Sequence, residues 1–322
     1  MRFNRLTKSI RTAGVVALSG AAAGAGLLAT AGIAHAAPAA TTYTFTTLNN
    51  QADPTFNQLL GINSAGTIAG YFGSGAAGHP NQGYTLVPPY GQANYTSENY
   101  PGSTQTQVIG INSDPNQDTA GFWANAANSN FGFVEWNGAF ESFRNPKTPK
   151  GAGQVNQLLG INNAGIAVGF YNDANGHSHP YVVNQATRRY YDLRVPGVSA
   201  QATGINNAND VVGFATTSTG VTYSFFKQPG GHLTSLQFPG GSDTQAFGVN
   251  DSDQIVGTYL DGAGVLHGFV LSDPNGPTTT WQSIDDPNGI GTTVVNGIND
   301  AGQLVGFYVD AAGNTDGFLA NP

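Results

Sequence analysis

Short apolar stretches alternate with turns rich in Gly, Asn, Asp and Pro along most of the chain. No stretch keeps the 3.6-residue spacing of apolar positions that an amphipathic helix needs. Short apolar runs bounded by such turn residues are typical of β-strands joined by tight connections. The pattern therefore predicts an all-β protein with many short strands.

The pattern of strands and turns is repeated, and each copy contains a Gly-(Ile/Val)-Asn triplet, at intervals of 49, 50, 44, 44 and 49 residues. The glycines of the six triplets are Gly61, Gly110, Gly160, Gly204, Gly248 and Gly297. After each triplet come Ala-Gly or Val-Gly, then a strand with an aromatic residue, then a strand that ends near proline. Four strands in about 45 residues are the dimensions of a propeller blade.

The two ends of the chain complement each other. The last repeat stops at its third strand, Gly317-Phe318-Leu319, whereas Thr42 to Leu48 resembles the fourth strands of the other copies. We therefore expect residues 37–322 to form one domain, a six-bladed β-propeller of four-stranded antiparallel blades. The N-terminal strand closes the ring, and the strand that ends in the triplet is innermost in each blade.

The repeat also resembles a known family. The pattern G-I-N-x-x-G-x-x-V-G-x-Y, as in Gly297 to Tyr308, is followed by Gly-Phe, as in Gly268-Phe269, and resembles the HAF-repeat family of extracellular bacterial proteins. The resemblance covers essentially all of residues 37–322 and implies an exported repeat protein with no established reaction. Two repeats depart from the pattern: residues 114–118 lengthen one turn, and Asn209 replaces a turn glycine in another.

Residues 1–36 have the composition of a signal peptide, with a basic start, a long Ala/Gly/Val/Leu stretch and a final Ala34-His35-Ala36. A retained membrane anchor is the alternative. No later segment is apolar enough to cross a bilayer, so we expect a secreted, extracellular protein that is free of the membrane after cleavage. We further expect a monomer without cofactor or metal.

Charge and cysteine content exclude several classes of function. Residues 37–322 carry 7 Lys and Arg against 19 Asp and Glu, a formal net charge of −12. Nucleic-acid binding requires a basic surface, so no nucleic-acid partner is expected. The absence of cysteine excludes disulfides, thiolate metal sites and a cysteine nucleophile.

Two sets of repeated polar or aromatic residues are candidate ligand contacts. The triplet asparagine, present in every copy, is expected to form an Asx-turn. Glutamines on the innermost strands could bind a hydroxylated ligand near the channel mouth, or could bond one another and close it: Gln58, Gln107, Gln157, Gln201 and Gln245. Aromatic residues at the ends of the second strands could offer stacking faces to sugars, among them Tyr259 and Tyr308.

Histidines and basic residues are not repeated and therefore mark individual blades. His177 and His179 flank Ser178 in the third repeat, and His267 occupies the matching strand of the fifth. A His-x-His pair can bind a metal from a strand, but the sequence specifies no third ligand. Six of the seven basic residues of 37–322 fall between Arg144 and Arg194.

We therefore expect a basic spot at the third blade that suits a carboxylate or sulfate, where these residues lie near one another: Lys147, Lys150, Tyr171, Asp173, His177 and His179. Three functions remain open. The first is a propeller that binds a polysaccharide or another polyhydroxylated extracellular ligand. The second is a lyase or glycoside hydrolase acting on an anionic glycan, with Tyr171, His177 or His179 as the base. The third is an extracellular scaffold for protein interactions.

Overall fold

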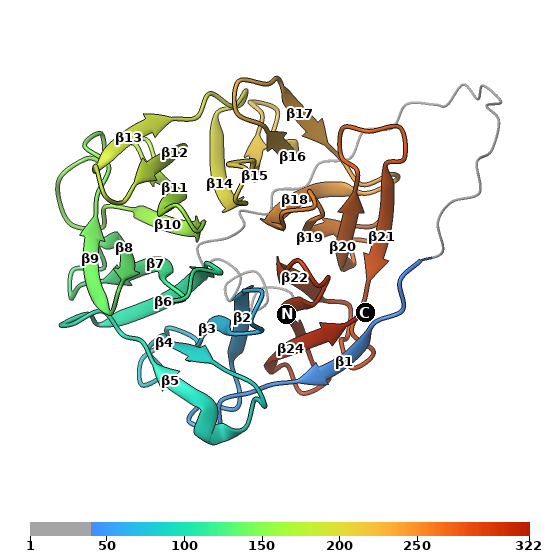
Figure 1. The fold of residues 1–322 in the computed structure, drawn as a ribbon, viewed down its shortest axis with the longest axis horizontal. Helices are drawn as coiled ribbons and strands as arrows, with labels where there is room; N and C mark the ends of the chain where they lie inside the picture. Colours follow the sequence, from blue (N-terminus) through green and yellow to red (C-terminus); the bar gives the residue numbers. More distant parts are fainter. Residues whose placement is uncertain (1–39) are drawn as a thin grey trace.

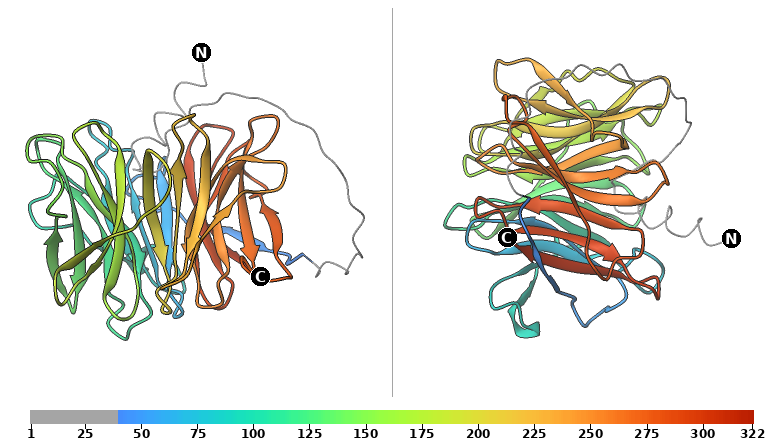
Figure 2. Two further views of the ribbon diagram at one scale, coloured as in Figure 1. Left: turned by 90° about the horizontal axis from the view of Figure 1, so that it is seen from above. Right: turned by 90° about the vertical axis from the view of Figure 1, so that its right-hand side faces the viewer.

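The computed structural model describes residues 40–322, and the predicted signal peptide lies outside the described residues. The described chain forms a ring of six blades around a central axis (Figure 1). Figure 2 shows the same ring from the side, with strands that run between its two faces. The fold is thus the predicted six-bladed, all-β propeller. Residues 40–322 contain no helix of the length and hydropathy that a membrane span requires.

Each blade is an antiparallel sheet of four strands. The first five blades use consecutive strands, numbered outward from the axis: β2 (Asn57–Ile62), β3 (Ile68–Phe72), β4 (Gln82–Leu86) and β5 (Tyr95–Ser97); β6 (Gln105–Ile111), β7 (Thr119–Ala124), β8 (Asn130–Trp136) and β9 (Ala139–Phe143); β10 (Asn156–Ile161), β11 (Ile166–Asn172), β12 (Ser178–Asn184) and β13 (Arg189–Asp192); β14 (Ser199–Ile205), β15 (Val211–Thr216), β16 (Thr222–Lys227) and β17 (Leu233–Leu236); β18 (Ser242–Val249), β19 (Ile255–Leu260), β20 (Leu266–Ser272) and β21 (Thr280–Ile284). A 3₁₀ turn, Gln92–Asn94, precedes β5.

The sixth blade joins the two ends of the described chain. Its sheet contains β22 (Thr293–Ile298), β23 (Leu304–Val309), β24 (Thr315–Asn321) and, on the outside, β1 (Thr44–Thr47). Phe45 pairs with Ala320 along the ladder, and the amide of Leu48 donates to the carbonyl of Gly317 at 2.8 Å. These contacts confirm the predicted closure of the ring by the N-terminal strand.

Glycines are required where strands approach most closely. The innermost strand of each blade has a bulge next to its triplet glycine, and the Val-Gly or Ala-Gly glycine of the second strand faces that bulge. A Cβ at Gly169 would lie 1.9 Å from the carbonyl oxygen of Gln157. A Cβ at Gly110 would lie 2.8 Å from the Cα of Gly160 in the next blade. Both repeated glycines therefore have a packing reason that holds in every blade.

The hydrophobic core lies between successive blades. Between blades 2 and 3, for example, Phe143 packs with Leu158 and Tyr181, all of them fully buried. The turns that contain the triplet asparagines gather around the axis on one face of the ring, which we call the turn face. The hairpins between second and third strands, and the linkers between blades, lie at the opposite strand ends, which we call the linker face.

Candidate functional site

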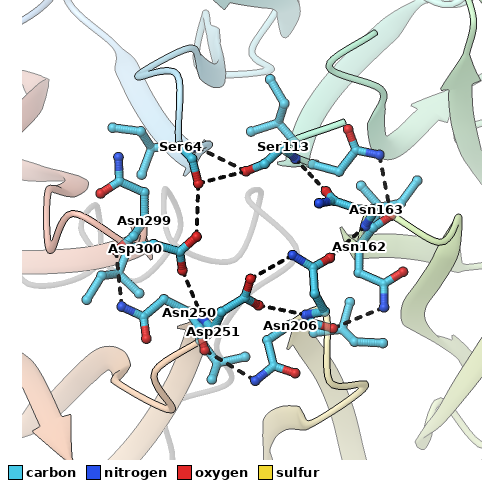
Figure 3. A pocket seen from close by; sticks show the side chains of 17 residues that line it. Ser64, Ser113, Asn162, Asn163, Asn206, Asn250, Asp251, Asn299 and Asp300 are labelled. Carbon is cyan, nitrogen blue, oxygen red and sulfur yellow. Dashed lines mark hydrogen bonds between the residues drawn. The ribbon is translucent and has the colours of Figure 1, made fainter. Parts of the chain in front are cut away.

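The triplet asparagines form a closed ring on the turn face, and Figure 3 shows Asn162, Asn206, Asn250 and Asn299 of this ring. In each of them, the side-chain oxygen accepts the backbone amides of its own turn; Asn63, for example, binds the amides of Ala65 and Thr67. The predicted Asx-turn is confirmed. The side-chain nitrogen of each triplet asparagine also donates to the backbone carbonyl of the equivalent asparagine in the next blade. The chain of bonds runs from Asn63 to Asn112 and finally from Asn299 back to Asn63. The sequence pattern did not predict these contacts between blades.

The residues that follow the asparagines form a second ring (Figure 3). The backbone amide of Asn207 donates to the carboxylate of Asp251 at 2.8 Å. The backbone amide of Asp251 donates in turn to the carboxylate of Asp300 at 2.9 Å. Ser64 closes this ring by donating its hydroxyl to Asp300 at 2.9 Å. The cavity at this mouth measures about 70 Å³, well below the ~300 Å³ of a small-molecule site. This end of the axis therefore joins the blades and has no room for a saccharide.

Replacing Asn162 by alanine should lower stability by about 2 kcal/mol, because two backbone amides and one carbonyl lose their partner. Denaturant unfolding followed by fluorescence measures this loss. The exposed Asn175, whose side chain forms no such bonds, provides the control: Asn175→Ala should change stability by less than ~0.5 kcal/mol. Equal effects of the two substitutions would contradict the structural role of the ring.

The glutamines of the innermost strands contact the preceding blade. Gln107 donates to Asn81, Gln157 donates to Asn130, and Gln201 donates to Ser178 at 3.5 Å. In the first blade, Gln58 instead accepts the hydroxyl of Tyr71 at 2.8 Å. Gln58, Gln107, Gln157 and Gln245 are at most 3% exposed, and Gln201 is partly exposed. These amides lie within the blade packing, and the bonds above run to the preceding blade or, for Gln58, within its own blade; none of them joins one glutamine to another.

The aromatic residues at the ends of the second strands are covered. Tyr259 is stacked on Phe238 at 3.6 Å on one side and on His267 at 5.3 Å on the other. Tyr308 is 4% exposed, and its hydroxyl bonds to Thr47 at 2.9 Å. These rings have no free face on which a sugar could stack. His267 is itself held by Asp285 at 2.7 Å and lies 3.4 Å from Asp261.

Residues from the third blade and its preceding linker form a polar cluster on the linker face. His179 stacks on Tyr171 at 5.2 Å and bonds to Asp173 at 3.1 Å, and the ring nitrogen of His177 lies 3.8 Å from the same carboxylate. Lys147 binds Asp192 and lies near Tyr171. The structure thus brings together five of the six residues expected at this spot. Lys150 is exposed, and no contact joins it to the cluster.

The electrostatics of this cluster disfavours Tyr171 as a base. The hydrogen bond from His179, with help from backbone amides, lowers the pKa of Asp173 to about 2. Burial raises the pKa of the Tyr171 hydroxyl, although Lys147 opposes this change. Tyr171 therefore stays protonated at neutral pH and is a poor general base. Within residues 40–322, no group of three or more His, Asp or Glu side chains is placed to hold a metal ion.

A groove of about 410 Å³ borders this cluster between blades 3 and 4. His179 belongs to both features, and the rest of the lining comes from the start of β12, from the linker that follows β13 and from the start of β14. Ser178, Ser199 and Arg194 contribute polar groups, whereas Val195, Pro196 and Val198 contribute apolar surface. Arg194 is exposed and has no ion-pair partner among the described residues. The volume lies within the usual range of small-molecule sites, about 300–1,000 Å³.

The groove exists because the seam between blades 3 and 4 is incompletely filled. Leu193 is partly exposed, whereas the equivalent residues Phe143, Leu236 and Ile284 are at most 5% exposed. On its other side, Leu193 lines a second, apolar groove of about 440 Å³ with Val182. In the sequence, Arg194 is only one of several basic residues. Nothing in the sequence predicts which seam between blades stays open, so Arg194 could not be singled out from it.

Comparison with known proteins supports the fold. No protein-family model and no curated protein matches the chain. Among solved structures, AofleA from Arthrobotrys oligospora is similar, with a TM-score of 0.51 and 12% identity over 87% of this chain and 86% of that one. TolB from Acinetobacter baumannii has a TM-score of 0.52 and 12% identity, over 79% of this chain and 63% of that one. At these identities the likeness establishes a shared propeller fold and nothing finer.

Proposed function

We propose that this protein is an extracellular propeller that binds a carboxylate-bearing saccharide in the groove between blades 3 and 4. The observation that carries the proposal is the exposed, unpaired Arg194 in a groove of about 410 Å³. A guanidinium binds a carboxylate through two parallel hydrogen bonds, which makes it specific as well as attractive. The HAF-repeat resemblance and the export of the chain remain part of this proposal.

The other polar groups of the groove suit hydroxyl groups of a sugar. The Oγ of Ser199 accepts the amide of Ser178 at 2.9 Å, so its own hydroxyl proton remains available to a ligand. Val195, Pro196 and Val198 provide the apolar surface against which the face of a pyranose ring can pack. Sites of this kind combine a mostly apolar wall with a few well-placed polar groups.

The other basic residues nearby are less available. Arg188 is paired with Glu141 at 2.8 Å and covers the ring of Phe143, and Lys147 is paired with Asp192. A ligand carboxylate would have to displace these partners, whereas Arg194 needs no such exchange. This difference supports Arg194 as the anion contact.

Calorimetric titration tests the proposal with uronic-acid oligosaccharides and with neutral oligosaccharides of the same length. The wild-type protein should bind the acidic series more tightly, and added salt should weaken that preference. Arg194→Ala should weaken binding of the acidic series by about tenfold or more, because it removes a charged hydrogen bond.

Arg189→Ala is the matched control, because Arg189 is an exposed arginine of β13 outside the groove lining. It removes the same charge and should leave affinity within about twofold, as expected for a surface charge outside the contact. Equal affinity for acidic and neutral oligosaccharides, or unchanged binding by Arg194→Ala, would refute the proposal.

A further inference from the structure

The seam between blades 1 and 2 carries polar residues at positions that are apolar in the other blades, except for Lys227 of the fourth blade. Glu98, Thr119 and Glu135 occupy three such positions. The residues equivalent to Glu98 are Phe143, Leu193, Leu236 and Ile284. Those equivalent to Thr119 are Ile68, Ala167, Val211, Ile255 and Leu304. Those equivalent to Glu135 are Leu86, Val183, Lys227, Leu271 and Ala320. The repeats therefore provide an internal reference, and this seam departs from it three times.

The two glutamates of this seam are partly buried, and Glu135 lies near enough to Glu98 for its charge to act on that carboxyl. The hydroxyl of Thr119 donates to Glu98. Desolvation raises the pKa of Glu98 to about 7, and the charge of Glu135 adds to this rise. Desolvation and the nearby Asp118 raise the pKa of Glu135 as well. Glu98 is therefore largely protonated at mildly acidic pH.

A second carboxyl pair joins blades 4 and 5 on the turn face. The side-chain nitrogen of Asn206 lies 3.2 Å from Asp210 and 3.0 Å from Asp253, so one amide donates to both carboxyl groups. Asp210 is 4% exposed. Desolvation and the adjacent Asp210 raise the pKa of Asp253 to about 6, and Asp251 contributes in the same direction.

A third pair lies where the linker between blades 5 and 6 meets β24. Asp286 is 3% exposed, and its Oδ2 has no hydrogen-bond partner within the described residues. Burial raises its pKa, and the charge of Asp316 adds to this. The pKa of Asp316 is raised by burial and by Asp310, although hydrogen bonds from Asn49 and Tyr308 oppose the change. A buried oxygen without a partner is rare, and a proton on this carboxyl removes the cost of a buried negative charge there.

No cation neutralises these pairs. In the part of the chain that the structure describes, Lys, Arg and His form ion pairs with other carboxylates and with none of these six. The charged groups that face them are Asp118, Asp251 and Asp310, all acidic. Ionising both members of a pair would therefore place like charges side by side at the contacts between blades.

We propose that these carboxyl groups make the propeller a pH-sensitive ring: in mild acid, protons on Glu98, Asp253 and Asp286 keep like charges from facing each other at the contacts between blades, and loss of these protons loosens the contacts as the pH rises. The proposal concerns the ring itself and does not depend on the ligand of the groove.

The pH window follows from the direction of the shifts. A carboxyl whose pKa is raised on folding binds a proton in the folded state that the unfolded chain has already lost, so stability falls as pH rises between the two values. For Glu98 this interval runs from about pH 4 to about pH 7. For Asp253 it runs from about pH 4 to about pH 6. Carboxyls with lowered pKa values, such as Asp173, act oppositely but only below about pH 4. We therefore expect maximal stability near pH 4 and a loss of stability from there towards neutral pH.

Thermal unfolding of residues 40–322 between pH 4.5 and 8.5 tests the proposal. The wild-type melting temperature should fall as pH rises, with up to a tenfold change in the unfolding constant per pH unit for each carboxyl that takes up a proton on folding. The variant Glu98→Gln/Asp253→Asn/Asp286→Asn imitates the protonated acids, because an amide is uncharged and has nearly the same shape as the protonated carboxyl. It should melt higher than the wild type at pH 8 and show a much flatter profile.

Glu141→Gln serves as the matched control, because Glu141 is a partly exposed carboxylate of β9 that is paired with Arg188. Its pH profile should follow that of the wild type. Glu98→Gln alone should reduce the fall of the melting temperature with pH, and this single variant keeps the test valid if the triple variant does not fold. A wild-type melting temperature that is level or rises from pH 5 to 8, or an unchanged slope in Glu98→Gln, would overturn the proposal.

Discussion

Replacing Gly169 by alanine should destabilise the propeller by about 3 kcal/mol or more, because the new methyl group has no space. Its Cβ would lie 1.9 Å from the carbonyl oxygen of Gln157 and 2.9 Å from the Cα of Leu158. Both atoms belong to the backbone of the bulged innermost strand, so no flexible side chain can move aside. The strand would have to shift, and it is packed against blades on both sides. Chemical denaturation, with the midpoint and slope fitted together, measures the loss.

Gly262→Ala is the control for that experiment. Gly262 lies in a hairpin of the fifth blade, and a Cβ there meets nothing within 4 Å. This substitution should change stability by no more than ~0.5 kcal/mol, and a small gain is possible because alanine restricts the unfolded chain. If the two variants were equally stable, the close approach at the bulge would not be a constraint on the fold.

A chain that begins at Asn49 instead of Ala40 should lose about 5 kcal/mol or more of stability, since it lacks the outer strand of the sixth blade. The deletion removes Leu48, which is 8% exposed, and Phe45, whose ring lies 5.4 Å from that of Phe318. It also breaks the ladder between β1 and β24. The edge of β24 would then be open to pairing with another chain, so we also expect a greater tendency to aggregate.

Melting temperatures of the two chains, with sedimentation to detect aggregates, provide the measurement. A synthetic peptide of residues 40–48 should restore part of the stability of the shortened chain in a concentration-dependent way. Thr46→Ala, which changes an exposed side chain of β1 and leaves the ladder intact, should have little effect. An unchanged melting temperature after the deletion would mean that β1 contributes nothing to closure of the ring.

The candidate site shows where inference from sequence stops. His179, Tyr171 and Lys147 could be placed together in advance, because the linker of one blade and the hairpin of the next share a face in every propeller with this strand order. The covered faces of Tyr259 and Tyr308 could not be predicted, because Phe238 and Thr47 reach them from other repeats. Arg194 became a candidate only once the open seam beside Leu193 was visible.

The sequence by itself determined the number of blades, the order of the strands, the closure of the ring and the Asx-turn of each triplet asparagine. These features depend on local turn chemistry and on a repeat, and both are written along the chain. Even Glu98 left a signal, as the single acid at a position that other repeats fill with apolar residues. Only the tertiary structure decided which rings are covered, which seam remains open and which carboxyls meet. These outcomes depend on contacts between blades, where residues far apart in sequence face each other and burial sets their charge.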